Sequence, residues 1–145
     1  MKDFHLFRKI VQFDAMIARE HYISKIRPFF ESNLIKIITG IRRCGKSVLM
    51  DQIEEELKSQ GRRTLKLNFE RRDVSSRIAN ADDLVAEVQK HTGKDKLFVF
   101  LDEVQMVDQW HLACRSLRLE NISLFITGSN SKLLSSEFAK ELSGR

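Results

Sequence analysis

The chain has 145 residues, of which 42% are hydrophobic and 31% charged, a balance typical of one folded domain with a sizeable core. Six glycines and a single proline exclude collagen-like, linker-rich and low-complexity chains. The longest apolar runs, such as residues 97–101, are too short to span a bilayer, and residues 1–17 lack the apolar centre of a signal peptide. We therefore expect a cytoplasmic protein without a membrane partner.

The spacing of cysteines and histidines and the net charge indicate the compartment, the metal content and the partners to expect. Cys44 and Cys114 stand far apart, and the four histidines form no paired motif, so the sequence favours a reducing compartment and no zinc site. The formal net charge of +5 suits anionic partners such as nucleotides or nucleic acid, and a solvated basic surface accounts for the same balance.

Residues 1–32 are expected to form an N-terminal helical segment. Apolar residues recur at mixed three- and four-residue spacing over 4–13 and 17–30, which predicts two amphipathic helices. Pro28 should disturb the second of them. The pattern then changes to short β-branched runs, so we assign the main domain to residues 33–145.

Within this domain, strands and helices are expected to alternate. Strands are predicted at residues 34–39, 64–69, 97–101 and 122–126. Helices are predicted at 46–60 before Gly61, between a cap at Asp82 or Asp83 and Gly93, and after a cap at Asp108. The near-continuously apolar strands predict an α/β fold of three layers, with a mainly parallel sheet covered on both faces and 97–101 central. Helical sequence from Lys132 reaches the chain end without another strand, so we expect a sheet truncated before its last strand.

A glycine-rich loop follows the first predicted strand. It matches the pattern GxxxxGK[ST] and consists of Gly40, Ile41, Arg42, Arg43, Cys44, Gly45, Lys46 and Ser47, with Val48 next in the helix. The glycines let consecutive backbone N–H groups point at phosphate, and the helix adds its positive N-terminal end. Lys46 is expected to reach the β- and γ-phosphates, and the Ser47 hydroxyl to bind Mg²⁺.

Two carboxylates end the third predicted strand. Because ligands of parallel sheets lie at the carboxyl ends of the strands, Asp102 should lie beside the loop and hold Mg²⁺. Glu103 can orient and deprotonate the attacking water. Two adjacent acids would repel each other without a cation, which also favours a metal.

Two further polar positions are weaker candidates. The fourth strand ends in Thr-Gly, and the following Ser129, or else Asn130, could contact the γ-phosphate or the water; a helix cap is the structural alternative. Arg145 could be supplied to the nucleotide of a neighbouring subunit, an idea that rests on its position alone.

These motifs together resemble a known family. The loop at 40–47, Asp-Glu-Val-Gln at 102–105 with a following Trp110, Thr-Gly-Ser at 127–129 and Gly-Arg at 144–145 are similar to the prokaryotic AAA-type ATPases that carry a C-terminal domain of unknown function. The resemblance implies ATP and Mg²⁺ as cofactors, with a Walker A loop and the acids at 102–103 as the Walker B pair. It implies Ser129 or Asn130 as the sensor, and a complete protein that continues past this chain.

Three functions remain open at this point. The first is an ATPase that couples nucleotide state to conformational change in a larger protein, as a homo-oligomer or with a partner protein. The second is a small-molecule kinase, which shares the phosphate loop but typically uses a lone acid and an arginine-rich lid. The third is a nucleotide-dependent nucleic-acid-binding module without turnover, which the basic charge permits and no motif supports.

Overall fold

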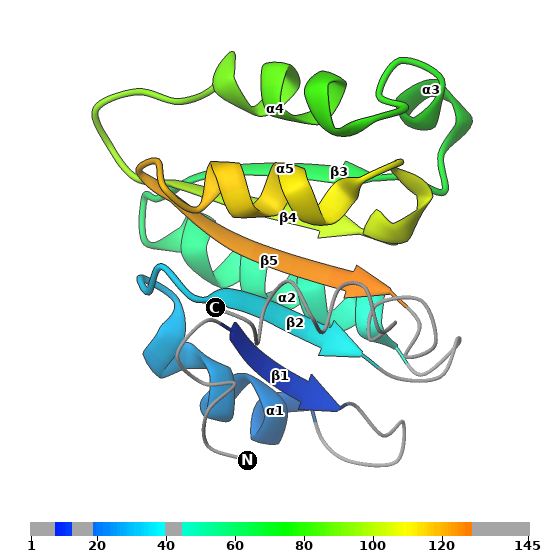
Figure 1. Cartoon of the computed structure of the whole chain (residues 1–145). Coiled ribbons are helices and arrows are strands. Elements are labelled where there is room, and N and C mark those ends of the chain that lie inside the picture. The colour runs from blue at the N-terminus through cyan, green and yellow to red at the C-terminus, as the bar shows by residue number, and fades with distance from the viewer. Residues whose placement is uncertain (1–7, 13–18, 40–44, 129–145) are drawn as a thin grey trace.

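The computed structural model describes residues 8–12, 19–39 and 45–128. This part of the chain contains one sheet whose neighbouring strands all run parallel, in the order β1-β2-β5-β4-β3 (Figure 1). Its strands are β1 (Arg8–Gln12), β2 (Ile35–Thr39), β3 (Arg63–Asn68), β4 (Leu97–Asp102) and β5 (Ile122–Gly128). The predicted parallel α/β fold is confirmed, with β4 as an interior strand and β5 in the middle.

Helices cover both faces of this sheet, with α2 behind it and α5 in front in Figure 1. Side chains from α1 (Arg19–Ile26) and α2 (Lys46–Ser59) form one apolar core with the sheet. Side chains from α3 (Arg72–Ser75), α4 (Ala81–Gln89) and α5 (Trp110–Leu117) form the other. Two short 3₁₀ turns, η2 (Arg27–Phe29) and η3 (Val104–Met106), follow α1 and β4. No described helix is long and apolar enough to cross a membrane.

The two cores explain the direction of the side chains on β4. All six residues of β4 are buried, because successive side chains point to opposite faces and both faces are covered. Phe98 and Phe100 pack in the core beneath α2, whereas Val99 and Leu101 pack in the core beneath α4 and α5. By the same alternation, Asp102 points to the α2 side.

The N-terminal part differs from the sequence prediction. Arg8–Gln12 is a strand that pairs with β2, where a helix was expected over residues 4–13. The pairing supplies hydrogen bonds to an edge of β2 that would otherwise lack them, and this tertiary pairing is stronger than the helical spacing of the apolar residues. The helix predicted over residues 17–30 agrees better with the structure. It begins as α1, which ends at Ile26, and Pro28 lies in the first turn of η2.

Two predicted helix caps are wrong. Asn80, and not an aspartate, caps α4, since its Oδ1 accepts a hydrogen bond of 2.9 Å from the backbone N–H of Asp83. Asp108 does not cap α5, which begins after Gln109. Asp108 instead forms an isolated parallel bridge with Asn80, which joins the starts of the two helices.

Gly61 ends α2 as predicted. Its φ of 77° lies in the left-handed region. Its N–H donates to the carbonyl of Lys58 at 2.9 Å, and the N–H of Arg62 donates to the carbonyl of Leu57 at 3.0 Å. This pair of bonds satisfies the last carbonyls of the helix and turns the chain into β3.

Candidate functional site

The candidate site lies where the N-terminus of α2 meets the carboxyl ends of β4 and β5. Gly45 precedes α2 with a φ of 89°, a left-handed conformation that favours glycine. Lys46 begins the helix with a side chain that is only 5% exposed, whereas Ser47 is exposed. The described end of the loop therefore passes directly into α2 through a left-handed glycine.

Asp102 contacts the first turn of α2 directly. Its Oδ2 accepts a hydrogen bond of 2.8 Å from the hydroxyl of Ser47. Asp102 is 1% exposed, and a buried carboxylate needs hydrogen-bond donors to offset the loss of water. The contact confirms that the end of β4 lies beside the start of α2, as the sequence predicts.

Thr127 on β5 supplies the second donor, which the sequence analysis missed. Its hydroxyl donates to Oδ1 of Asp102 at 2.5 Å and accepts a hydrogen bond of 3.0 Å from the backbone N–H of Glu103. The strand register pairs Leu101 with Ile126, and the next residues along the two strands, Asp102 and Thr127, therefore lie side by side. The sequence signal was a polar residue at the carboxyl end of an apolar strand that adjoins β4.

The donor set fits a magnesium ion that is bound together with phosphates. Mg²⁺ prefers oxygen ligands and commonly takes one or two from protein, with water and substrate phosphates completing its shell. Ser47 and Asp102 offer a hydroxyl and a carboxylate oxygen that lie 2.8 Å apart. Among the described residues no group of three His, Cys, Asp or Glu side chains could hold a metal ion by itself.

Glu103 has an unusual backbone conformation. Its φ of 59° and ψ of 51° place it in the left-handed region, which side-chain-bearing residues rarely adopt. Its half-buried side chain accepts, at Oε1, a hydrogen bond of 2.7 Å from Nε2 of Gln105 in η3. Such strain concentrates at functional sites, where the surrounding structure maintains it.

The structure brings part of the predicted set together. Ser47 and Asp102 are in contact, and Glu103 is joined to them through the Thr127 hydroxyl. Val48, expected in the nucleotide site, is 43% exposed on the first turn of α2. The predicted residues outside the described part are Gly40, Ile41, Arg42, Arg43, Cys44, Ser129, Asn130 and Arg145.

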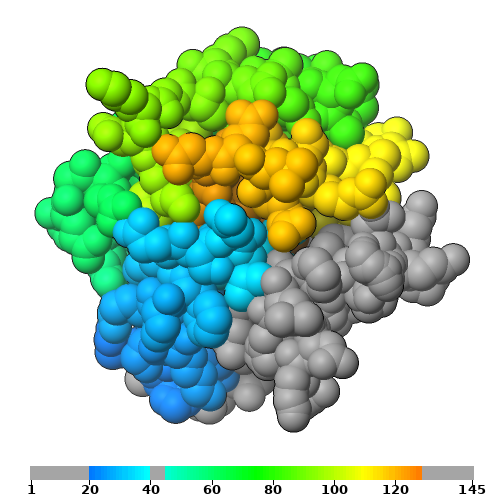
Figure 2. Space-filling model, turned by 60° about the vertical axis from the view of Figure 1, so that its left-hand side comes forward, coloured from blue at the N-terminus to red at the C-terminus, as the bar shows by residue number. Residues whose placement is uncertain are grey.

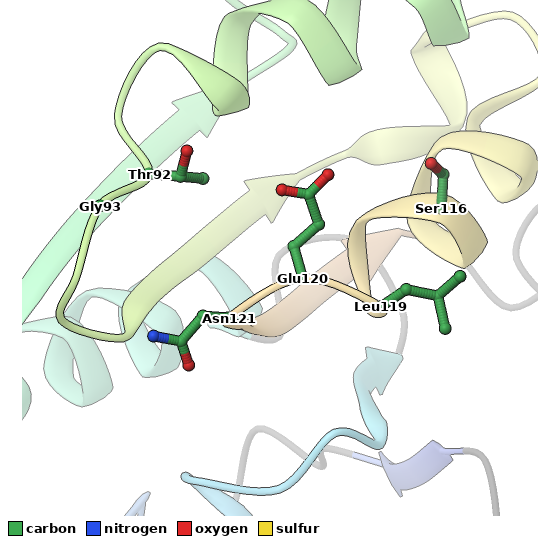
Figure 3. A pocket seen from close by; sticks show the side chains of 6 residues that line it. All are labelled: Thr92, Gly93, Ser116, Leu119, Glu120 and Asn121. Carbon is green, nitrogen blue, oxygen red and sulfur yellow. The ribbon is translucent and has the colours of Figure 1, made fainter.

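The described cavities lie elsewhere. An open depression of about 620 Å³ lies at the amino ends of β4 and β5, where Thr92 and Glu120 flank it (Figure 3). Oε2 of Glu120 accepts a hydrogen bond of 2.9 Å from Gln89. A smaller groove of about 300 Å³ runs between α4 and α5. Both are separate from the carboxyl ends of the strands.

A buried lysine lies far from the site, near the amino end of β2. Lys36 Nζ donates to the carbonyl of Ser32 at 2.9 Å and to the hydroxyl of Ser123 at 2.6 Å. Burial lowers the pKa of Lys36 to about 7; repulsion from Lys96 acts in the same direction and attraction to Glu31 opposes it. Figure 2 shows, from outside, light-blue residues of the N-terminal part next to orange residues from around β5, and Lys36 itself is buried.

Cys114 is a second core residue whose pKa is shifted by burial. It is a free thiol on α5 and is fully buried. Burial raises the pKa of the Cys114 thiol to about 12, because the thiolate would lose its solvation. Cys114 is therefore a packing residue and not a nucleophile.

A family model and curated relatives match this chain. Residues 32–145 match the family model described as an AAA domain. An uncharacterized protein of Haemophilus influenzae is 39% identical over 137 residues, covering 90% of this chain and 34% of its own length. An uncharacterized protein of Methanocaldococcus jannaschii is 39% identical over 117 residues, covering 78% of this chain and 25% of its own length.

The chain thus spans between a quarter and about a third of the length of these relatives. The match begins before the phosphate loop and includes both acids, so it covers every part of the candidate site. The matched residues 32–145 make up more than half of the chain and include the parallel sheet from β2 to β5, and the chain belongs to the AAA-type P-loop ATPase family.

Proposed function

We propose that this chain binds ATP together with Mg²⁺ and hydrolyses it, and that the change of nucleotide state drives a conformational change in a larger protein. The observation that carries the proposal is the 2.8 Å hydrogen bond between Ser47 and Asp102. It joins the first turn of the phosphate-loop helix to the carboxylate best suited to a metal, although 55 residues separate the two in sequence.

Binding is assigned to residues 40–48. The backbone N–H groups of the loop would bind the phosphates, and the N-terminus of α2 would add its partial positive charge. Lys46 neutralises the β- and γ-phosphates. Ser47 and Asp102 would hold Mg²⁺, which would supply electrostatic stabilisation of the phosphate charge.

Hydrolysis is assigned to the residues beyond the metal ligands. Glu103 orients the attacking water and accepts its proton. Thr127 keeps both acids in place, since its hydroxyl contacts the carboxylate of Asp102 and the backbone N–H of Glu103. Ser129 or Asn130, which follow β5 in the sequence, would contact the γ-phosphate or the water.

The test is nucleotide turnover by the whole protein that carries this chain. Lys46→Ala should weaken ATP binding at least ~10-fold, because the phosphate charge loses its partner. Glu103→Gln should retain ATP binding while the rate of phosphate release falls about 100-fold or more, the usual effect of losing a general base. Lys58→Ala, an exposed lysine on the same helix, is the matched control and should leave both unchanged.

The products distinguish the remaining functions. An ATPase releases inorganic phosphate, whereas a kinase transfers labelled phosphate from ATP to a metabolite. A nucleic-acid-binding module would bind DNA with an affinity that falls steeply with salt, and would show no turnover. Tight ATP binding by Lys46→Ala, or unchanged phosphate release by Glu103→Gln, would contradict the proposal.

A further inference from the structure

Gln105 is the described side chain that contacts the carboxylate of Glu103. Its Nε2 donates a hydrogen bond of 2.7 Å to Oε1 of Glu103 from the middle of η3. The assignment of the amide is chemically determined, because the opposite orientation would place two oxygen acceptors against each other. The Glu103 carboxylate therefore receives a donor from its own turn, two residues away.

The oxygen of the same amide is left without a hydrogen bond within the described part of the chain. Oε1 of Gln105 is buried and has no hydrogen-bond partner among the described residues. A buried acceptor without a partner destabilises a fold, because it gives up its hydrogen bonds to water and gains none in return. The orientation of the Gln105 amide is thus explained by its bond to Glu103 and not by satisfaction of its own polar atoms.

Glu103 is consequently held at two points. Its backbone N–H donates to the Thr127 hydroxyl at 3.0 Å while its φ stays at 59°. Its carboxylate is held by Gln105 at one oxygen, Oε1. A left-handed residue tied at both main chain and side chain is pre-organised, which is what a base that must meet a water in one geometry requires.

We propose that Gln105 is a positioning residue that fixes the Glu103 carboxylate, through the bond between Nε2 and Oε1, in the orientation in which it receives the proton of the attacking water. This inference rests on the proposed ATPase function. The bond leaves Oε2 of Glu103 to receive that proton. In this assignment Gln105 acts only through its bond to Glu103.

The test uses Gln105→Met in the whole protein, because methionine keeps the length of the side chain and removes the donor. The rate constant for ATP turnover should fall about 10–100-fold, the effect of a base displaced by a fraction of its contact distance. The dissociation constant for a fluorescent ATP analogue should stay within about twofold, because the contacts that bind phosphate are intact. The thermal midpoint should be unchanged or higher, because the buried oxygen is removed as well.

Three further variants separate a positioning role of Gln105 from a merely structural one. Gln105→Glu keeps the shape of the side chain and lacks the donor, so it should lose turnover at least as strongly while still binding the analogue. Met106→Gln changes a residue of the same turn that is 57% exposed and should leave turnover unchanged. Combining Gln105→Met with Glu103→Gln should slow single turnover no further than Glu103→Gln does alone.

Several results would overturn the inference. Turnover of Gln105→Met within about twofold of the parent, while Glu103→Gln is impaired, would show that Glu103 needs no such partner. An additive loss in the double variant, or a lowered thermal midpoint that accounts for the lost rate, would assign Gln105 a structural role. Full turnover by Lys46→Ala would instead refute the proposed ATPase function itself.

Discussion

The hydroxyl of Ser47 donates a hydrogen bond of 2.8 Å to the carboxylate of Asp102. The two residues belong to the start of α2 and the end of β4, so the bond forms only when the helix has docked on its face of the sheet. The parallel topology makes this possible, because the carboxyl ends of β2, β5 and β4 lie at one edge, where the loop before α2 begins.

Replacing Thr127 with valine should disturb both acids at once. The substitution conserves shape and removes the donor to Oδ1 of Asp102 and the acceptor of the Glu103 N–H, while Oδ2 of Asp102 keeps its bond from Ser47. We expect a loss of about 1–3 kcal/mol in the free energy of unfolding, measured by urea denaturation. Thr64→Val, whose hydroxyl contacts Glu54 at the half-buried edge of β3, is the control and should lose less. Equal losses would contradict the bridging role.

Gly61→Ala should destabilise the end of α2. No atom lies within 4 Å of the added Cβ, so the cost comes from the φ of 77° alone. We expect the free energy of unfolding to fall by about 1 kcal/mol, as measured in a thermal or urea transition. Gly93→Ala is the matched control, because its Cβ would meet only the flexible end of Arg63 at 3.4 Å. A loss at Gly61 no larger than at Gly93 would show that the left-handed turn is not needed.

The sequence predicts the repetitive part of this fold well. The apolar run at 97–101 and the strand at 122–126 lie within β4 and β5, since continuous β-branched and aromatic residues favour buried parallel strands. The helix after the loop ends at Ser59, one residue before its predicted end, because Gly61 is a strong stop signal. The sequence pattern therefore predicts those elements whose structure is determined by residues close together in the sequence.

Other features depend on contacts that no local pattern contains. Arg8–Gln12 is a strand because β2 offers an unpaired edge, which a helical spacing cannot reveal. Thr127 and Gln105 contact the acids because of strand register and the left-handed turn at Glu103. Asn80 caps α4 in place of Asp82 or Asp83, since several neighbouring residues could each serve as a cap.

Lys36 should make stability depend on pH. Because burial lowers its pKa to about 7, the folded chain binds fewer protons than the unfolded chain between that pH and the ordinary lysine range. The free energy of unfolding should therefore rise with pH, by about 2 kcal/mol between pH 7 and pH 9. Lys36→Met should flatten this rise in urea titrations at several pH values, whereas the exposed Lys94→Met should retain it. An unchanged slope in Lys36→Met would contradict the assignment.

Cys114 should resist alkylation in the native protein. Its thiol is fully buried, and burial raises its pKa to about 12, so almost no thiolate is present near neutral pH. In a Cys44→Ser background, iodoacetamide should leave the native chain unlabelled and label it once after denaturation, as read by mass spectrometry. Rapid labelling of the native variant would show that α5 opens readily from the sheet.

Magnesium coupling tests the central claim most directly. The dissociation constant for ATP is measured with and without Mg²⁺ in the parent, in Asp102→Asn and in the control Asp108→Asn, with thermal midpoints recorded for each. The parent and Asp108→Asn should bind ATP at least ~10-fold more tightly with Mg²⁺, and a folded Asp102→Asn should lose most of that gain. Equal strengthening by Mg²⁺ in Asp102→Asn would contradict the assignment of this carboxylate, and with it the proposed nucleotide site.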